Sequence, residues 1–542
     1  MKRYILVTLF VVAALLRLVH LGSVPPAPSL DEVSIGYNAY SIMVTGKDEY
    51  GNSFPLLLRA YDDFRPALYV YLTIPFVAVF GLTAVAVRLP AFVLSLITLW
   101  ATYQIGVLVG NKYLGTRAIG ELALAILAIS PWHIYLSRLG HEANLGLTLA
   151  VLGLYFLLRA VIAKRGRDWI YTAVFFALSL HGYQSQKLIV PCIAAVTLLL
   201  FWKELLREKK QVIIAVMAGS VIAIPAMIVS LSPEGMSRFK GTSAFAPDSP
   251  VMTEATSRYA DAVTRHDLFG RVVYSKYTTS LAIFAGNYLS HFSPRWLFTG
   301  SEREAHKVPG MGLLYLWELP FLVAGVVFLA KKKFPSRVTL LLAAYLVAAP
   351  IPAALTTGAP HAMRFYSAIP IPQIVAALGV WYVIGMLKSD GKRLLGVIIA
   401  IVAISGVAVF WNGYFIRFPR EQSDSFQYAI SEAVSYVKQQ EGTYARIEMS
   451  NQGALYQSYM FFLFYSNYDP KKYLAQGGTT SGGFAASHTI GSYAFGFLPE
   501  RTEDMSEDTL YLYDSNGVPA GAKVLKRFAN KNGETAIIAV TK

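Results

Sequence analysis

The sequence predicts a mainly α-helical protein that crosses a membrane many times and ends in a small α/β domain. Of its 542 residues, 55% are hydrophobic and only 15% are charged, whereas soluble domains have about 45–50% and about 25%. Uncharged runs of about 17–25 residues, the length that crosses a bilayer core, recur between Tyr4 and Phe415. After Phe415 the long apolar runs stop, and helix-like and strand-like segments alternate with turn signals.

We predict about eleven spans. The first begins at Tyr4 after a short basic start, and no small-residue cleavage site follows it, so we expect a retained span rather than a removed signal peptide. The spans cover residues 4–21, 84–109, 117–136, 143–162, 169–183, 188–202, 212–231, 312–330, 338–355, 365–387 and 394–415.

One apolar segment, residues 66–81, is not counted as a span. It is interrupted by Pro75 and is shorter than the roughly 20 residues of a straight span. If it crossed the membrane, every later basic cluster would move to the outer side. We therefore expect an interfacial or re-entrant helix that packs against the bundle.

Lysine and arginine collect in every second connection between the predicted spans, and the positive-inside rule places these connections in the cytoplasm. The clusters are Lys2/Arg3, Lys112/Arg117, Lys164/Arg165/Arg167, Lys203/Arg207/Lys209/Lys210, Lys331/Lys332/Lys333/Arg337 and Lys388/Lys392/Arg393. Much of the net charge of +15 is therefore an orientation signal, and we expect no nucleic-acid partner.

This orientation predicts a multi-pass protein of the plasma (inner) membrane with a cytoplasmic N-terminus. It divides the chain into a membrane domain, residues 1–416 with outer loops 22–65 and 232–310, and an extracytoplasmic α/β domain, residues 417–542. In the α/β domain we predict a helix at 426–439 and strands at 445–449, 509–513 and 535–540. The single cysteine, Cys192, excludes a disulfide framework and a cysteine-based metal site.

The polar residues that could do chemistry gather on the predicted outer side. Asp31 and Glu32 follow the first span and precede an amphipathic run. Two adjacent carboxylates can divide labour, one as a general base and the other as a positioning acceptor or metal ligand. The structural alternative is a pair of solvated loop acids, one of which caps the following helix.

Two further clusters lie at the start of later apolar segments. Arg65, after Asp62 and Asp63, stands at the start of an apolar segment, where a guanidinium can hold a lipid phosphate; interface anchoring is the alternative. Glu142 would enter a span, where acids face a cavity or a partner. Its alternative is an ion pair with Arg138 one helical turn away.

The remaining outer clusters are mainly cationic and aromatic. Singly, each is a snorkelling membrane anchor, but their gathering on one face predicts a cavity there. They contain Tyr183 and Lys187, His361 and Arg364, and in the long loop His291, Arg295, Arg303 and His306.

These residues resemble the GT-C glycosyltransferases, and within them the branch of the protein O-mannosyltransferases and lipid A aminoarabinose transferases. The resemblance rests on the Asp-Glu pair, on Arg65-Pro66-Ala67-Leu68-Tyr69 and on the Arg-Leu-Pro-Ala run at 88–91. The Ser-Pro-x-His run at Ser130, the Tyr-Gln-Ser run at Tyr183 and the Pro-His-Ala-x-Arg run at Pro360 resemble bacterial dolichyl-phosphate-mannose-mannosyltransferase-like members.

The resemblance implies a GT-C bundle with an odd number of spans and juxtamembrane helices. It also implies transfer of a sugar from a polyprenyl-phosphate donor on the extracytoplasmic side. Asp31 matches the catalytic base, with Glu32 beside it, and Arg65 matches the residue that meets the donor phosphate. Glu142 stands where many members have aspartate. Further expected contacts are Lys187, His361 and Arg364 to the donor phosphate, and Tyr37, Tyr69, Tyr183 and Arg138 to substrate.

The chemistry is consistent with this assignment. Gly-rich phosphate loops of the Walker or dinucleotide type are absent from the sequence, so we expect a lipid-linked donor, membrane lipid as surroundings, and a protein, lipid or glycan acceptor whose attack inverts the anomeric carbon. We assign no cofactor and no metal, although related oligosaccharyltransferases use a metal held by acidic ligands.

Two other function classes fit parts of the sequence. A transporter or flippase of lipid-linked sugars would also have cations and aromatics along a cavity, but paired halves and helices broken near the midplane are typical of that class. A third class is an anchoring protein that acts only through its outer domain.

Reporter fusions test the predicted topology. Alkaline phosphatase, which is active only outside the cytoplasm, is expected to be inactive when fused after Lys112 and active when fused after Lys542. A cytoplasmic fluorescent reporter should give the opposite pattern. An active phosphatase after Lys112 would reverse the assigned orientation.

Overall fold

The computed structural model describes residues 3–61, 63–300, 306–331, 334–480 and 487–542. Five residues named above, Lys2, Asp62, Arg303, Lys332 and Lys333, lie outside the described residues. The chain divides into two compact units. The first unit contains Met1–Leu16, Leu94–Leu136 and Ala143–Ala408, and the second contains Arg17–Val93, Ser137–Glu142 and Val409–Lys542.

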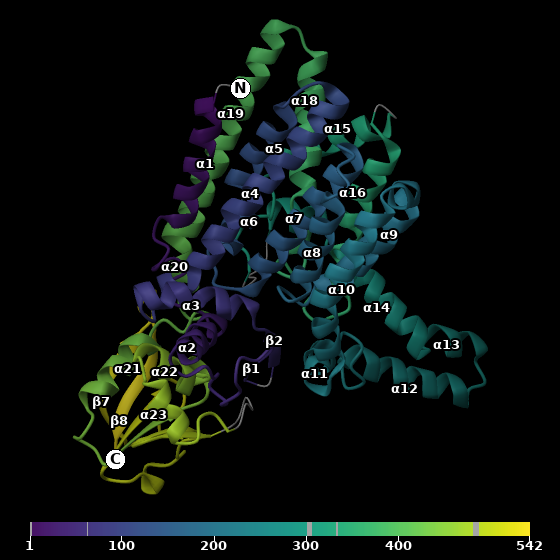
Figure 1. Cartoon of the computed structure of the whole chain (residues 1–542). Helices are drawn as coiled ribbons and strands as arrows, with labels where there is room; N and C mark the ends of the chain where they lie inside the picture. Colours follow the sequence, from purple (N-terminus) through teal and green to yellow (C-terminus); the bar gives the residue numbers. More distant parts are fainter. Residues whose placement is uncertain (1–2, 62, 301–305, 332–333, 481–486) are drawn as a thin grey trace. The chain divides into compact units, whose positions relative to one another are not determined.

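The first unit is built from helices (Figure 1). Its long apolar helices are α1 (Arg3–Leu18), α4 (Ala84–Leu114), α5 (Ala118–Ile129), α7 (Glu142–Ile162), α8 (Asp168–Leu180), α9 (Gln186–Arg207), α10 (Lys209–Leu231), α15 (Glu318–Ala330), α16 (Ser336–Ala348), α18 (Ile371–Met386) and α19 (Ser389–Trp411). Each predicted span therefore contains a helix, and the bounds of α1, α4, α7 and α19 extend into the second unit. Short helices continue two of them: α6 (Pro131–Leu136) and α17 (Ile351–Ala354).

Seven segments of the described chain are long and apolar enough to cross a membrane, which makes the chain a multi-pass membrane protein. They are Ala84–Leu114, Glu142–Ile162, Gln186–Arg207, Lys209–Leu231, Ser336–Ala354, Tyr366–Met386 and Ser389–Glu421. The other predicted spans contain shorter apolar helices. Residues 66–81 also form a short helix, α3 (Leu68–Phe80), with Pro75 inside it.

Glycines bring the helices of the first unit close together. A Cβ atom on Gly379 of α18 would overlap the carbonyl oxygen of Phe321 on α15, and one on Gly325 of α15 would overlap that of Val375 on α18. Helices that lack a hydrophobic driving force in lipid pack through such small residues. Figure 1 shows α15 and α18 side by side.

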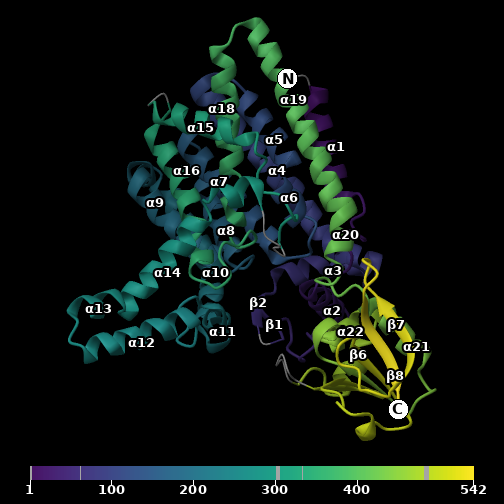
Figure 2. The ribbon, with the colours of Figure 1, turned by 180° about the vertical axis from the view of Figure 1, so that it is seen from behind.

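The long loop of the first unit is also helical. It contains α11 (Pro233–Thr242), α12 (Pro250–Thr264), α13 (Leu268–Val273), α14 (Lys276–Ser290) and the π-turn η1 (Arg295–Thr299), and a 3₁₀ turn η2 (Tyr366–Ala368) precedes α18. Helices α12 and α14 lie side by side and are joined by α13 in both views (Figures 1 and 2).

The second unit combines residues from both ends of the chain. Its N-terminal part contains α2 (Leu30–Thr45), the hairpin of β1 (Leu57–Ala60) and β2 (Asp63–Pro66), and α3. The hairpin pairs Leu58 with Arg65 and was not predicted. The C-terminal helices and turns are η3 (Asn412–Arg417), α20 (Phe418–Glu421), α21 (Ile430–Gln439), η4 (Gly453–Leu455), α22 (Ser458–Tyr465), α23 (Pro470–Ala475) and η5 (Thr502–Asp504).

The second unit also holds a six-stranded sheet in the order β4-β5-β3-β6-β8-β7. Its strands are β3 (Arg446–Ser450), β4 (His488–Ile490), β5 (Tyr493–Gly496), β6 (Thr509–Asp514), β7 (Lys523–Ala529) and β8 (Thr535–Thr541). The predicted α/β fold of this region is confirmed, and β3, β6, β8 and α21 match the predicted segments; β4, β5 and β7 were missed. Strands β5, β3 and β6 are parallel and the other pairs are antiparallel.

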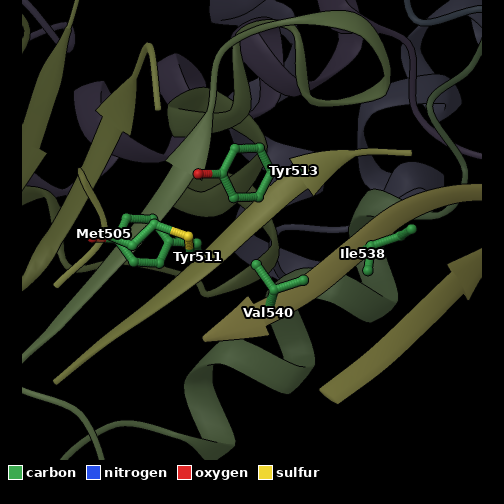
Figure 3. Close-up of a cluster of buried hydrophobic side chains, with 5 residues drawn as sticks. All are labelled: Met505, Tyr511, Tyr513, Ile538 and Val540. Carbon is green, nitrogen blue, oxygen red and sulfur yellow. The ribbon is translucent and has the colours of Figure 1, made fainter. Parts of the chain in front are cut away.

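Alternate residues of β6 and β8 form a core on one face of the sheet. Tyr511 pairs with Val540 and Tyr513 with Ile538, and Met505 joins these four buried side chains (Figure 3). Successive residues of a strand point to opposite faces, so this cluster covers only one of them. Figure 2 shows β6, β7 and β8 beside α21, and α21 contacts β7.

Candidate active site

The first turn of α2 carries the two predicted acids. Ser29 caps this helix: its hydroxyl accepts a hydrogen bond from the Glu32 amide, at 3.3 Å, and its amide donates to Glu32 Oε2, at 2.8 Å. This reciprocal capping box fixes where the helix starts. Asp31 and Glu32 therefore lie in the first turn, where the helix dipole favours negative charge.

Glu32 is a buried anchor. It is only 1% exposed, and its Oε1 accepts hydrogen bonds from Arg88 Nε, at 2.7 Å, and from the Gly140 amide, at 2.9 Å. Its Oε2 accepts from Arg88 Nη2, at 3.1 Å, besides the Ser29 amide. Both oxygens of this predicted catalytic neighbour are thus occupied by the protein itself.

Arg88, on α4, uses all five of its N–H groups. Two bind Glu32, and the other three donate to the carbonyl oxygens of Leu21, Pro25 and Ala27, at 2.9, 3.1 and 2.7 Å. The side chain is fully buried. One arginine therefore ties the loop after α1 to the start of α2, a role that the sequence reading missed.

Asp31 is the accessible acid of the pair, with 40% of its side chain exposed. Its Oδ1 accepts a hydrogen bond from Arg65 Nη2 at 2.7 Å, and its Oδ2 lies 3.6 Å from His141 Nε2. The other ring nitrogen of His141 lies 3.4 Å from Glu142 Oε2. The structure thus brings together Asp31, Arg65 and Glu142, as the outer clusters predicted, and adds His141, whose only signal was its place beside Glu142.

Arg65 supplies a fixed positive charge next to Asp31. Its side chain is 4% exposed. Burial lowers the pKa of Arg65, but the carboxylates of Asp31, Glu142 and Asp63 outweigh this effect, so its pKa is raised and it stays charged. Its Nε and Nη1 are buried and find no hydrogen-bond partner among the described residues.

Three other predicted site residues of this unit lie in internal contacts. Arg138 donates to the carbonyl oxygens of Arg17 and Val24, at 2.8 and 2.9 Å. Residues 137–141 are not helical and α7 begins at Glu142, so the alternative of a one-turn helical pair between Arg138 and Glu142 is wrong. Tyr69 and Tyr37 are buried and donate to the carbonyl oxygens of Val87, at 3.0 Å, and Tyr468, at 3.3 Å.

A second buried acid, Glu49, links the outer loop to the C-terminal region. Its Oε1 accepts from Asn38 at 3.0 Å, and its Oε2 accepts from Thr479 at 2.8 Å and from Tyr459 at 3.3 Å. Burial raises the pKa of Glu49 from 4.5 to about 7, against the opposing effect of these donors. No feature of the sequence singled out this residue.

In the first unit, three predicted residues line one cavity of about 340 Å³: Tyr183, Lys187 and Arg364. The rest of the lining includes Leu188, Leu231, Met236, Pro352 and Leu355. Arg364 donates to the hydroxyl of Thr356, at 2.5 Å, and to the carbonyl oxygen of Thr357, at 2.7 Å. A largely apolar cavity with two cations in its lining fits an anionic lipid.

His361 lies in a histidine cluster of the same unit. Its amide donates to His291 Nε2 at 3.1 Å, and its ring stacks on His306 with 4.9 Å between centroids. Burial lowers the pKa of His291 to about 4, which keeps this ring neutral and able to accept. Within the described parts of the chain, no group of three or more His, Cys, Asp and Glu residues is arranged to hold a metal ion.

Residues 65–230 match the family described as dolichyl-phosphate-mannose-protein mannosyltransferase. The matched segment contains Arg65, Arg88, Glu142 and Lys187 and confirms the predicted resemblance. The comparison with curated protein sequences found no match.

Solved structures share the fold over nearly the whole chain. ArnT from Cupriavidus metallidurans bound to undecaprenyl phosphate aligns over 99% of this chain and 98% of its own, at 12% identity and a TM-score of 0.55. Its apo state aligns over 98% of this chain and 97% of its own, at 13% identity and a TM-score of 0.53. The archaeal oligosaccharyltransferase AglB from Archaeoglobus fulgidus was solved in complex with an inhibitory peptide and a dolichol-phosphate. It aligns over 85% of this chain and 63% of its own, at 11% identity and a TM-score of 0.51. The predicted fold class is confirmed.

Replacing Arg88 tests the buried anchor. Arg88→Met should lower the free energy of unfolding by about 3–5 kcal/mol, because it leaves the buried Glu32 carboxylate without its partner. Thermal unfolding of the purified protein in detergent measures this change. Arg501→Met, at an exposed arginine of the same unit, is the control and should unfold like the wild type; equal melting temperatures for all three proteins would contradict the anchoring role.

The pKa of Glu49 predicts a pH-dependent stability. Because its folded-state pKa is raised from 4.5 to about 7, its contribution is complete below pH 4.5 and is lost as the pH rises through 7. Between pH 4.5 and pH 8, the free energy of unfolding of the wild type should fall by about 3 kcal/mol relative to that of Glu49→Gln. Melting temperatures between pH 4.5 and 8.5 measure this, with the exposed Glu507→Gln as control. A constant difference between wild type and Glu49→Gln would refute it.

Proposed function

We propose that the chain is a membrane glycosyltransferase that transfers a sugar from a polyprenyl-phosphate donor to an acceptor hydroxyl on the extracytoplasmic side. The match of residues 65–230 to the family described as dolichyl-phosphate-mannose-protein mannosyltransferase supports this proposal. One observation carries the proposal. An accessible carboxylate, Asp31, is held by the buried cation Arg65, while the neighbouring Glu32 is fully engaged in the fold.

In this proposal Asp31 is the general base. It accepts the proton of the acceptor hydroxyl as the acceptor oxygen attacks the anomeric carbon of the donor sugar. The bond between that carbon and the phosphate oxygen breaks, the polyprenyl phosphate leaves with the bonding electrons, and the anomeric configuration inverts. His141, next to both Asp31 and Glu142, is a positioning residue for the base.

Arg65 has the geometry to meet the departing phosphate. Its Nη2 holds Asp31, while its Nε and Nη1 have no partner among the described residues. A guanidinium with two available N–H groups can bind two phosphate oxygens at once. Its positive charge stabilises the negative charge that develops on the leaving group.

The cavity of the first unit suits the lipid part of such a donor. Its apolar walls accept an isoprenoid chain, and Lys187 and Arg364 in its lining provide charges for the phosphate. The similar structures support a ligand of this class, since ArnT is bound to undecaprenyl phosphate and AglB to a dolichol-phosphate. The assignment of this cavity to the donor rests on the residues that line it.

Replacing the base tests the reaction. Asp31→Asn replaces one carboxylate oxygen by an NH₂ group and should lower kcat by about 100- to 10,000-fold, the usual contribution of a general base. The measurement uses purified protein in lipid nanodiscs with a panel of labelled undecaprenyl-phosphate monosaccharides, and follows sugar transfer to added acceptor or water. Asp508→Asn, at an exposed aspartate elsewhere in the same unit, is the control and should stay within about threefold of the wild type. Donor binding without any release in the wild type would favour transport and overturn the proposal.

Replacing Arg65 tests the phosphate contact separately. Arg65→Ala should raise the donor KM by about 10- to 100-fold, because it removes charge-assisted hydrogen bonds worth about 1.5–3 kcal/mol. Arg65→Lys keeps the charge but loses the two-pronged geometry, so it should recover only part of the affinity. An unchanged donor KM with a lower kcat would instead make Arg65 a residue that only positions Asp31.

A further inference from the structure

The sheet of the C-terminal region has a switch point between β3 and β6. The chain runs from β3 to the parallel strand β5 on one side, and then crosses back to the parallel strand β6 on the other side of β3. The connections that leave the carboxyl ends of these strands therefore diverge. In open α/β sheets, ligands bind in the crevice that such divergence creates.

A cavity of about 420 Å³ lies at this place. It is lined by residues that follow each of the three parallel strands: Gln452 and Gly453 after β3, Phe497 and Glu500 after β5, and Asn516 and Gly517 after β6. Its volume lies within the range of about 300–1,000 Å³ of small-molecule sites.

Hydrogen bonds join the walls of this cavity into one framework. The Asp514 carboxylate, at the end of β6, accepts from the amides of Ala454, at 2.9 Å, and Asn516, at 3.1 Å. The hydroxyl of Tyr513, whose ring is drawn in Figure 3, donates to the carbonyl oxygen of Pro499 at 2.8 Å. Gly453 has a positive φ of 55° and touches Asp514 so closely that a Cβ atom would overlap the carboxylate. The cavity is therefore preformed.

The lining excludes one class of ligand and favours another. None of the described residues that line it carries a positive charge, whereas Glu500 and Asp514 carry carboxyl groups, so a phosphate or other anion is disfavoured. The carboxamides of Gln452 and Asn516 offer both donors and acceptors and are exposed.

An aromatic ring completes the set. Phe497 is 66% exposed, although a side chain of this size is usually buried. The lining therefore offers acceptors and donors for hydroxyl groups beside an apolar ring that can pack on C–H groups. A sugar ring presents both hydroxyl groups and C–H groups. We propose that this cavity binds a saccharide.

This binding site is separate from the transfer chemistry, and the proposal stands whether or not Asp31 is a catalytic base. The experiment therefore measures binding without turnover. It uses the full-length protein in lipid nanodiscs and saturation-transfer NMR with the methyl glycosides of mannose, glucose, galactose and N-acetylglucosamine at millimolar concentration.

Two variants remove the contacts without disturbing the fold, since both side chains are exposed: Asn516→Ala and Phe497→Ala. Asn532→Ala is the matched control, because Asn532 also precedes a glycine in an exposed turn of the same domain but does not line the cavity. We expect saturation transfer to at least one glycoside, a loss of affinity of about tenfold or more in both cavity variants, and no change in Asn532→Ala or Asp31→Asn.

Two results would overturn the proposal. One is the absence of saturation transfer to all four glycosides, or transfer that both cavity variants leave unchanged. The other is a calcium titration that shifts the NMR signals of Asp514 and Glu500 while no glycoside binds, which would make the cavity a cation site. Equal melting temperatures of the variants and the wild type establish that a lost signal reflects the site and not unfolding.

Discussion

The buried ion pair between Glu32 and Arg88 is the interaction on which the candidate site depends. Burying two charges costs free energy unless every donor and acceptor finds a partner, and here all five N–H groups of Arg88 and both oxygens of Glu32 are engaged. Three of those bonds hold carbonyl groups of the loop before α2. The start of α2, and with it the backbone of Asp31, is therefore fixed by a contact that faces away from the reacting groups.

Helix geometry explains how two adjacent acids come to differ. Successive residues of an α-helix point about 100° apart, so when Glu32 faces Arg88, Asp31 faces solvent and Arg65. Glu49, in the turn after α2, receives hydrogen bonds from Asn38 and from residues more than 400 positions later. Such contacts explain why Arg17–Val93 and Val409–Lys542 fold into one compact unit, whereas the domains predicted from topology divide the chain at residues 416 and 417.

The sequence predicts those features that depend on local composition. Hydropathy located a helix in every predicted span because length and apolarity are local properties, and the outer clusters supplied Asp31, Arg65 and Glu142, which the structure brings together. It could not predict that Arg88 binds an acid 56 residues away and three carbonyl groups. The four-residue strands β1 and β2 and the short strands β4 and β5 were also not predicted, because so few residues show no clear alternation of apolar and polar side chains. The roles of the individual site residues stay predictions.

The close approach of Gly140 to Val87 has a genetic consequence. A Cβ atom at position 140 would overlap Val87, and the Gly140 amide is one of the donors to Glu32, so positions 32, 88 and 140 govern whether the chain reaches its folded state. Position 31 governs what the folded chain can do. In a mutational scan scored once for the amount of protein and once for turnover, two neighbouring codons would therefore give opposite phenotypes, an absent protein at 32 and an abundant but silent one at 31.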